Sequence, residues 1–163
     1  MSEGAGAWIP ANPEFAAVVR DSFGRQRFMR TLGATLDLVT PGVVGIAFPF
    51  DEALCQQNEY LHAGVLTSTA DSACGYAALS LLPAGTDVLS VEFKINLLAP
   101  ARGEKFLALA RVLRAGRTLT VASAEVFANP AAERTLVAVL TATIISRASL
   151  TADRGSVRSQ ERP

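Results

Sequence analysis

The segment from residue 62 to residue 82 constrains the fold of this chain most strongly. It contains no proline and is rich in alanine, leucine and serine, and this composition and length favour a helix over a strand. Its apolar residues cover more than one stripe of that helix, namely Val65, Leu66, Ala70, Ala73, Cys74, Ala77, Ala78 and Leu81. A helix with this pattern is surrounded by protein on most sides. The rest of the chain must therefore enclose it.

The flanking segments predict a short helix and several strands. An asparagine and a proline open a helical pattern over residues 12–23, which predicts a short amphipathic helix. Residues 36–38 and 43–50 flank a Pro-Gly turn and predict a β-hairpin. Four further strands are predicted over residues 90–97, 106–114, 117–127 and 135–145, the middle two joined by a tight turn at Ala115-Gly116.

The first of these four strands alternates strictly between apolar and polar residues. Val91, Phe93, Ile95 and Leu97 are expected on one face, and Ser90, Glu92, Lys94 and Asn96 on the other, which is typical of a half-buried strand. Short connections predict an antiparallel sheet, and a helix that is apolar on most sides needs a sheet curved around it. The predicted fold class is therefore α+β, the hotdog arrangement of an antiparallel curved sheet wrapped around one long central helix.

We expect one folded domain over residues 31–147, preceded by an N-terminal segment with a short helix (residues 1–30) and followed by a flexible polar tail (residues 148–163). The 163 residues carry fifteen basic and fifteen acidic side chains. This balance argues against nucleic acid or an anionic membrane as the main partner. Half of the residues are apolar and 18% are charged, so some apolar surface is expected to be shared with another subunit.

The compartment is predicted from cysteine usage and from the longest apolar runs. Cys55 and Cys74 are too few for a disulfide framework, which predicts a reducing cytoplasm, with Cys74 as a small core residue. The N-terminus lacks the pattern of a secretory signal. Residues 43–50 and 136–145 are much shorter than the roughly 20 residues that span a bilayer, so no transmembrane segment is expected.

Candidate catalytic residues cluster around the start of the long helix. His62 is the only histidine, and the chain has no second histidine for a metal, no Gly-x-Ser-x-Gly elbow and no phosphate-binding loop. Gly64 and Asp71 are seven residues apart, which places them on one helix face about 10 Å apart. The free N–H groups at the helix start can hold an oxyanion. A carboxylate on the same face then indicates acyl transfer, although Asp71 alone is equally readable as a satisfied buried carboxylate.

Longer stretches of the chain resemble the PaaI-like acyl-CoA thioesterases of the hotdog superfamily. The similar stretches are Leu61-His62-Ala63-Gly64-Val65, Ala70-Asp71-Ser72-Ala73, Val91-Glu92-Phe93-Lys94 with Asn96, Ala99-Pro100-Ala101 with Gly103, and Arg114-Ala115-Gly116-Arg117-Thr118. They occur in order over roughly residues 36–145, which makes the resemblance more specific than a single short motif. It implies hydrolysis of an acyl-CoA thioester to a free carboxylic acid and CoA.

The resemblance also implies roles for individual residues near the helix. Asp71 corresponds to the carboxylate that acts as nucleophile or general base. The N–H after the family's histidine is the oxyanion donor and falls on Ala63, where this chain has His-Ala-Gly instead of His-Gly-Gly. Alanine keeps this donor. His62 then orients the active-site loop, or it only serves as a helix-start residue. Gly64 at the same end is a further candidate catalytic residue, or it only permits close packing.

Two more polar residues correspond to positions that orient the reactants. Gln56 corresponds to an amide six residues before the histidine that positions water or the thioester, and a shift by one residue would give this role to Gln57. Ser90 corresponds to a hydroxyl that faces the carboxylate from across the dimer. The alternative for Ser90 is a solvated position on the polar face of its strand.

CoA binding is expected at the hairpin that carries Arg114 and Arg117. Arg114 corresponds to a basic residue near the CoA nucleotide, and a neutral protein needs local cations to hold the CoA phosphates. Both arginines are otherwise ordinary solvated surface residues. CoA is part of the substrate, and neither a metal nor a redox cofactor is expected.

The resemblance implies a homodimer that pairs into a homotetramer, with the active site between subunits. Two alternatives to hydrolysis stay open. One is a hotdog hydratase or dehydratase, against which the absence of a proline-containing motif after His62 counts. The other is an acyl-CoA-binding protein without turnover. The acyl group stays open between fatty and aromatic acids, and so does the pathway.

Overall fold

A computed structural model describes residues 8–129, 131 and 133–148 of the chain. Its elements in chain order are α1 (Phe15–Arg25), α2 (Arg27–Thr31), β1 (Thr35–Thr40), β2 (Val43–Pro49), the 3-10 turn η1 (Glu52–Leu54), α3 (Ala63–Leu79), β3 (Thr86–Leu97), β4 (Lys105–Ala115), β5 (Leu119–Ala128) and β6 (Thr135–Ala148). None of the helices that the structure describes is long and apolar enough to cross a membrane.

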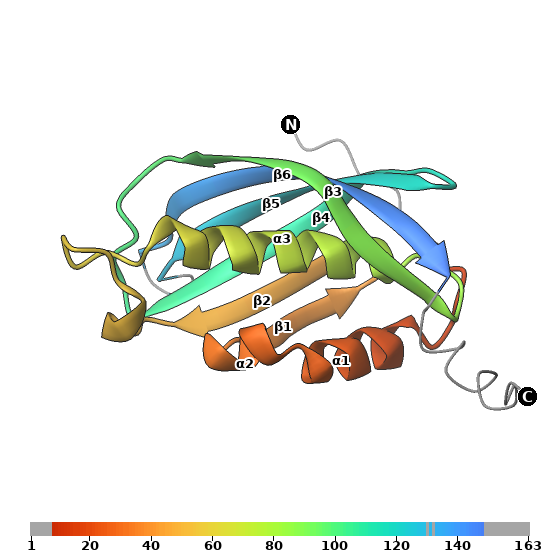
Figure 1. The fold of residues 1–163 in the computed structure, drawn as a ribbon, viewed down its shortest axis with the longest axis horizontal. Helices are drawn as coiled ribbons and strands as arrows, with labels where there is room; N and C mark the ends of the chain where they lie inside the picture. Colours follow the sequence, from red (N-terminus) through yellow and green to blue (C-terminus); the bar gives the residue numbers. More distant parts are fainter. Residues whose placement is uncertain (1–7, 130, 132, 149–163) are drawn as a thin grey trace, which may run out of the picture.

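The strands form one curved antiparallel sheet in the order β1-β2-β4-β5-β6-β3. Figure 1 shows α3 lying across the concave side of this sheet, with α1 and α2 next to β1 and with β3 running over α3 from the opposite edge. The predicted hotdog arrangement is therefore confirmed.

The central helix is enclosed on most of its surface, as its apolar pattern predicts. Ten of its residues are buried, and they pack against the inward side chains of β2, β4, β5 and β6. A stripe with Gly64, Ser68, Asp71, Ser72 and Gly75 is only partly covered or exposed. The helix ends at Leu79, earlier than residue 82. Polar and small side chains thus mark the side of α3 that the described residues cover least.

Ser80 follows the last residue of α3 and ties the helix end to a neighbouring turn. The Ser80 side chain donates to the Ala77 carbonyl and accepts from the Gly42 N–H. This hydroxyl joins the helix end to the β1–β2 turn, where Gly42 has a φ of 74°. A left-handed conformation of this kind suits glycine, which has no Cβ to clash.

The predicted alternation in β3 is confirmed from Glu92 to Leu97 and is wrong at Ser90 and Val91, where the strand contains a bulge. The pairing of β3 with β6 shifts between Ser90 and Glu92, which leaves Val91 as the extra residue. Ser90 lies opposite Ile144 and Phe93 opposite Ala142, and both of these partners are buried on the side of α3. Ser90 and Phe93 therefore share the face that lies toward α3, although the sequence pattern placed them on opposite faces.

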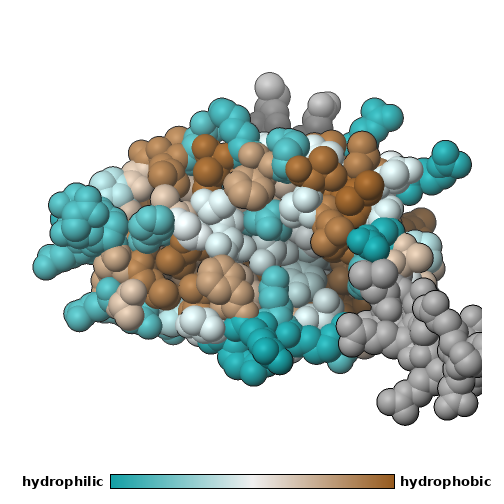
Figure 2. All heavy atoms as spheres, viewed as in Figure 1, coloured by the Kyte–Doolittle hydropathy of each residue, from teal (hydrophilic) through white to brown (hydrophobic). Residues whose placement is uncertain are grey.

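The expectation that β3 is half-buried is also wrong within one chain. Val91, Phe93 and Leu97 are 56%, 45% and 53% exposed. β3 is the last strand of the described sheet and pairs only with β6, so its other edge is open. In Figure 2, hydrophobic side chains gather where β3 crosses the molecule. The apolar surface expected from the composition thus includes this edge strand.

The N-terminal helix differs from its prediction in two ways. It starts at Phe15 instead of residue 12, because the Asn12 side chain accepts from the Glu14 N–H and forms a turn before the helix. A second short helix, α2, follows directly, because Gln26 takes an extended conformation that ends α1. Met29 of α2 is fully buried. The predicted polar tail lies outside the described residues, apart from Ala148.

Candidate active site

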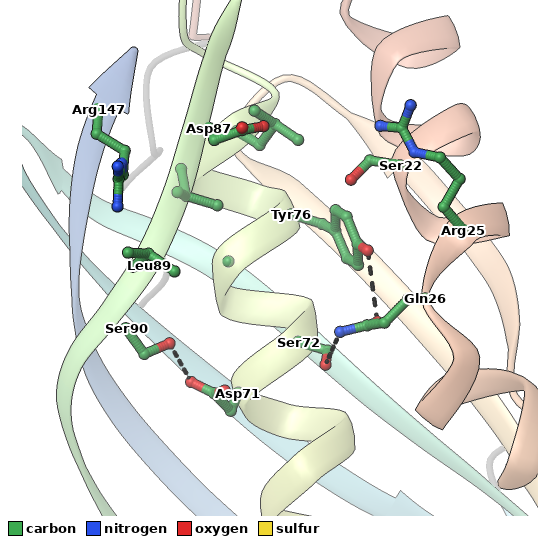
Figure 3. A pocket seen from close by; sticks show the side chains of 13 residues that line it. Ser22, Arg25, Gln26, Asp71, Ser72, Tyr76, Asp87, Leu89, Ser90 and Arg147 are labelled. Atoms are coloured by element: carbon green, nitrogen blue, oxygen red, sulfur yellow. Dashed lines mark hydrogen bonds between the residues drawn. The ribbon is translucent and has the colours of Figure 1, made fainter. Parts of the chain in front are cut away.

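A pocket of about 570 Å³ lies between α1 with the following residue Gln26, the helix α3 and the strand β3, and Arg147 of β6 also lines it. Its lining residues are Ser22, Arg25, Gln26, Asp71, Ser72, Gly75, Tyr76, Leu79, Asp87, Val88, Leu89, Ser90 and Arg147. Figure 3 shows Asp71 and Ser90 at one end and Arg147, Asp87 and Ser22 toward the other. Asp71, the carboxylate that the helix pattern singled out, therefore lines a cavity.

Asp71 and Ser90 form a direct contact in this pocket. The Ser90 hydroxyl donates to Asp71 Oδ1 over 2.6 Å (Figure 3). This bond fixes one carboxylate oxygen and leaves Oδ2 for chemistry. The two residues belong to the same chain, whereas the resemblance led us to expect Ser90 from across the dimer. The bulge at Val91 explains the contact, because it lets Ser90 point toward α3.

His62, Ala63 and Gly64 form the start of α3. His62 is the N-cap residue, and its Nδ1 accepts the Gly64 N–H over 2.9 Å. A Cβ on Gly64 would lie 2.9 Å from that same Nδ1, so glycine leaves room for the imidazole. Among the described residues, the Ala63 N–H donates to no other group. Ala63 thus carries a backbone donor that is free to bind an oxyanion.

The loop that leads into α3 is held by several hydrogen bonds. The His62 N–H donates to the Leu54 carbonyl, and the Leu61 N–H donates to the Ala101 carbonyl. The Arg102 guanidinium donates to the Tyr60 hydroxyl over 2.7 Å and lies 4.5 Å from the centre of the Tyr60 ring. These contacts fix the direction of the Ala63 N–H.

Gln56 lies in this loop and outside the pocket. Its side chain accepts the Asn58 N–H and its carbonyl accepts the Glu59 N–H. Within one chain Gln56 therefore shapes the turn before His62, and the structure does not bring it to Asp71.

Arg114 and Arg117 lie at the β4–β5 hairpin and do not line the pocket. The pocket instead contains Arg25 and Arg147, which were not among the candidate residues. Gln26 and Tyr76 were missed as well. They come from segments about 50 residues apart, and no local pattern in the sequence indicates their contact.

The Ala63 N–H at the start of α3 and the Asp71 carboxylate near its middle are too far apart to act on one thioester within one chain. Eight residues separate Ala63 from Asp71, which corresponds to about 12 Å along the helix axis. The oxygen of a reacting carbonyl lies about 3 Å from its hydrogen-bond donor, and its carbon is attacked from about 3 Å. The donor and the attacking atom at one carbonyl are therefore much less than about 12 Å apart. The Ala63 N–H and the Asp71 carboxylate of one chain therefore cannot act on the same thioester carbonyl.

The cysteine and metal chemistry of the described residues is limited. Burial raises the pKa of the Cys74 thiol to about 12, and the nearby Asp71 carboxylate adds to the rise. Because the thiolate is the nucleophilic form, Cys74 is a core residue, as predicted. No group of three or more His, Cys, Asp and Glu side chains in the described ranges is arranged to hold a metal ion.

Several proteins that resemble this chain in sequence or structure are named as thioesterases. Residues 58–135 match the family model of the thioesterase superfamily. A thioesterase family protein from Silicibacter pomeroyi is 49% identical, and the match covers 83% of this chain and 99% of that one with a TM-score of 0.81.

Two less similar structures share the fold. The PaaI protein from the phenylacetic acid degradation operon of E. coli is 18% identical over 85% of this chain and 97% of its own, with a TM-score of 0.77. A thioesterase from Haemophilus influenzae is 22% identical over 79% of this chain and 88% of its own, with a TM-score of 0.72. The chain belongs to the hotdog-fold thioesterase superfamily.

Proposed function

We propose that this protein hydrolyses acyl-CoA thioesters to a free carboxylic acid and CoA. The observation that carries the proposal is the pairing of Asp71 with Ser90 at the end of a pocket, on a helix whose first N–H has no acceptor among the described residues. Water adds to the thioester carbonyl, the C–S bond breaks, and the thiol takes up a proton. These steps need neither a metal nor a redox cofactor.

Asp71 supplies the base or the nucleophile. Its Oδ2 either removes a proton from water or attacks the carbonyl to form an anhydride that water then opens. Ser90 holds Oδ1 in place, so the free oxygen keeps one direction. The Ala63 N–H stabilises the negative charge that develops on the carbonyl oxygen. Both routes give the same products.

The active unit is a homodimer in this proposal. One chain's Asp71 and Ala63 are about 12 Å apart along the helix, so the donor for a given Asp71 comes from the second copy. The exposed apolar edge strand β3 provides the surface for that copy, since an open, apolar edge readily pairs with another chain. Gln56 of the second copy then reaches the site together with its Ala63. Two dimers pair into a tetramer.

The CoA nucleotide binds at the β4–β5 hairpin of this assembly, where Arg114 and Arg117 contact its phosphates. Both cysteines are free thiols, which fits a cytoplasmic location. The E. coli PaaI protein comes from a phenylacetic acid degradation operon. By analogy we include aromatic acyl-CoA esters beside fatty ones as substrates.

Release of free thiol from a panel of short, long and aryl CoA esters tests the function. We expect turnover by the wild type and a loss of about 100- to 10,000-fold in kcat for Asp71→Ala, because the group that moves the proton is gone. Equal, low thiol release by both proteins with intact acyl-CoA binding would instead show a binding protein. Hydration of an enoyl-CoA without thiol release would show a hydratase.

A further inference from the structure

The side chain of Gln26 enters the pocket from the junction between α1 and α2 (Figure 3). Its backbone N–H donates to the Phe23 carbonyl and closes α1. Its side chain takes no part in capping α2, although Gln26 is the N-cap residue of that helix. The amide is instead directed at α3, so the local helix geometry does not account for its position.

Two hydrogen bonds hold the Gln26 amide, and both are long. Nε2 donates to the Ser72 hydroxyl over 3.4 Å, and the Tyr76 hydroxyl donates to Oε1 over 3.4 Å. Typical bonds of these kinds are about 0.4 to 0.7 Å shorter. A primary amide also has a second N–H and a second lone pair. The group is therefore positioned by weak contacts and keeps donor and acceptor capacity for a ligand.

The two partners of the Gln26 amide lie close to Asp71 along α3. Ser72 follows Asp71 directly, and Tyr76 is five residues further on than Asp71, which is about 7 Å along the helix axis. Burial raises the pKa of the Tyr76 phenol, so this hydroxyl stays a donor. When the carbonyl of a substrate lies at Asp71, a substituent a few atoms further along its acyl chain would thus reach the Gln26 amide.

The charge of the pocket favours a neutral group at this place. Its charged lining residues are two arginines, Arg25 and Arg147, and two aspartates, Asp71 and Asp87, so the formal charges cancel. Arg25 is also paired with Asp21 over 2.9 Å. Apolar side chains such as Leu79 form the walls between these groups. Such a cavity suits an apolar chain with a neutral polar end better than the polyanionic nucleotide of CoA.

We propose that Gln26 is a specificity-determining residue that binds a neutral hydrogen-bonding substituent, a hydroxyl or carbonyl, on the acyl group of the thioester. This inference rests on the proposed thioesterase function and adds the class of acyl group. Ser72 and Tyr76 hold the amide in register, and the substituent replaces or joins these two long bonds. Substrates that lack the substituent leave the amide with its weak partners only.

A pair of matched substrates tests this role. The ratio of kcat/KM for 6-hydroxyhexanoyl-CoA to that for hexanoyl-CoA is measured for the wild type, Gln26→Met and Arg27→Met. We expect a wild-type ratio above one, which falls about three- to tenfold in Gln26→Met, the range that corresponds to one hydrogen bond. Arg27 lies next to Gln26, is exposed and does not line the pocket, so Arg27→Met should keep the wild-type ratio.

Other outcomes overturn the proposal. An unchanged ratio in Gln26→Met shows that the amide does not read the acyl group. An equal loss for both substrates shows that it binds the pantetheine amides that all CoA esters share. Absence of thiol release from every ester in the wild type is a different result, since it rejects the thioesterase function itself.

A second variant covers the case in which Gln26→Met does not fold. Ser72→Ala removes one partner of the amide and improves helix propensity. We expect the ratio to fall about twofold to fivefold, because Gln26 loses one of its two anchors. A wild-type ratio in a folded Ser72→Ala protein, together with an unchanged thermal midpoint, contradicts a positioning role for Ser72 and the network that we propose.

Discussion

The candidate site on α3 has two ends that differ in the kind of group they offer: a backbone end at Ala63, at the start of the helix, and a side-chain end at Asp71, near its middle. The first end is made of backbone, the free N–H of Ala63, which the capped turn at His62 and the anchored loop hold in place. The second end is made of side chains, Asp71 and Ser90, which open into a pocket. A backbone donor tolerates alanine in place of glycine at position 63, whereas the second end depends on the identity of its residues.

The comparison also shows why one chain is insufficient. The backbone end and the side-chain end are rigidly joined by eight residues of helix, about 12 Å, and cannot approach each other. A second copy with a twofold axis near the exposed strand β3 can bring the backbone end of one chain to the side-chain end of the other. The stiffness of α3 is thus an argument for a shared active site.

The largest effect is expected when either end is disabled in both chains of the dimer. Asp71→Asn removes the reactive carboxylate, and Ala63→Pro removes the donor N–H. Proline is favoured at the first helical position, and His62 before it has φ −60° and ψ 139°, which a residue preceding proline adopts readily. The homodimer of Asp71→Asn and the homodimer of Ala63→Pro should each lose about 100- to 10,000-fold in kcat. Ala63→Ser keeps the N–H and should stay active.

Co-expression of the two inactive variants then restores part of the activity. Half of the dimers are mixed, and each mixed dimer has one intact site, so about a quarter of the wild-type rate is expected for a twofold assembly. Differently tagged chains confirm that mixed dimers are present. Mixed dimers without activity would mean that both groups act within one chain, and a fully active monomer in sedimentation would exclude a shared site.

The fold could be predicted because its main signal is local in sequence. The apolar pattern of residues 62–82 requires an enclosed helix, and the short turns require antiparallel strands. Asp71 stands out for the same reason, as a charge within that pattern. The helix start could be identified as a candidate donor because N-terminal N–H groups are unpaired in any α-helix.

The parts that could not be predicted depend on pairing and on distant contacts. The bulge at Val91 decides which face of the sheet Ser90 occupies. This bulge depends on how β3 pairs with β6 and is not visible in the sequence of β3 alone. The Gln26 amide meets Ser72 and Tyr76, which are 46 and 50 residues away. No periodicity links such positions, so only the folded chain reveals the pocket that they line.

A smaller effect is expected at the side-chain end from Ser90→Ala. The variant leaves Asp71 in place and removes the hydroxyl that holds Oδ1, so the carboxylate samples more orientations. We expect kcat to fall about tenfold with little change in KM, the effect of one hydrogen bond to a charged group. Ser90→Thr keeps the hydroxyl and serves as the control. Equal kcat values for the alanine variant and the wild type would make Ser90 an ordinary residue of an exposed strand.

The smallest effect is expected at the backbone end from His62→Ala, and it concerns stability first. The variant loses the hydrogen bond from the Gly64 N–H to Nδ1, and loss of an N-cap side chain costs about 1 kcal/mol. His62→Asn supplies another N-cap acceptor and should regain most of the free energy of unfolding, which urea denaturation measures. If the asparagine variant is as unstable as the alanine variant, capping is not what His62 contributes. If it is stable but slow, the imidazole has a further role beside the Ala63 N–H, and the backbone end then depends on a side chain after all.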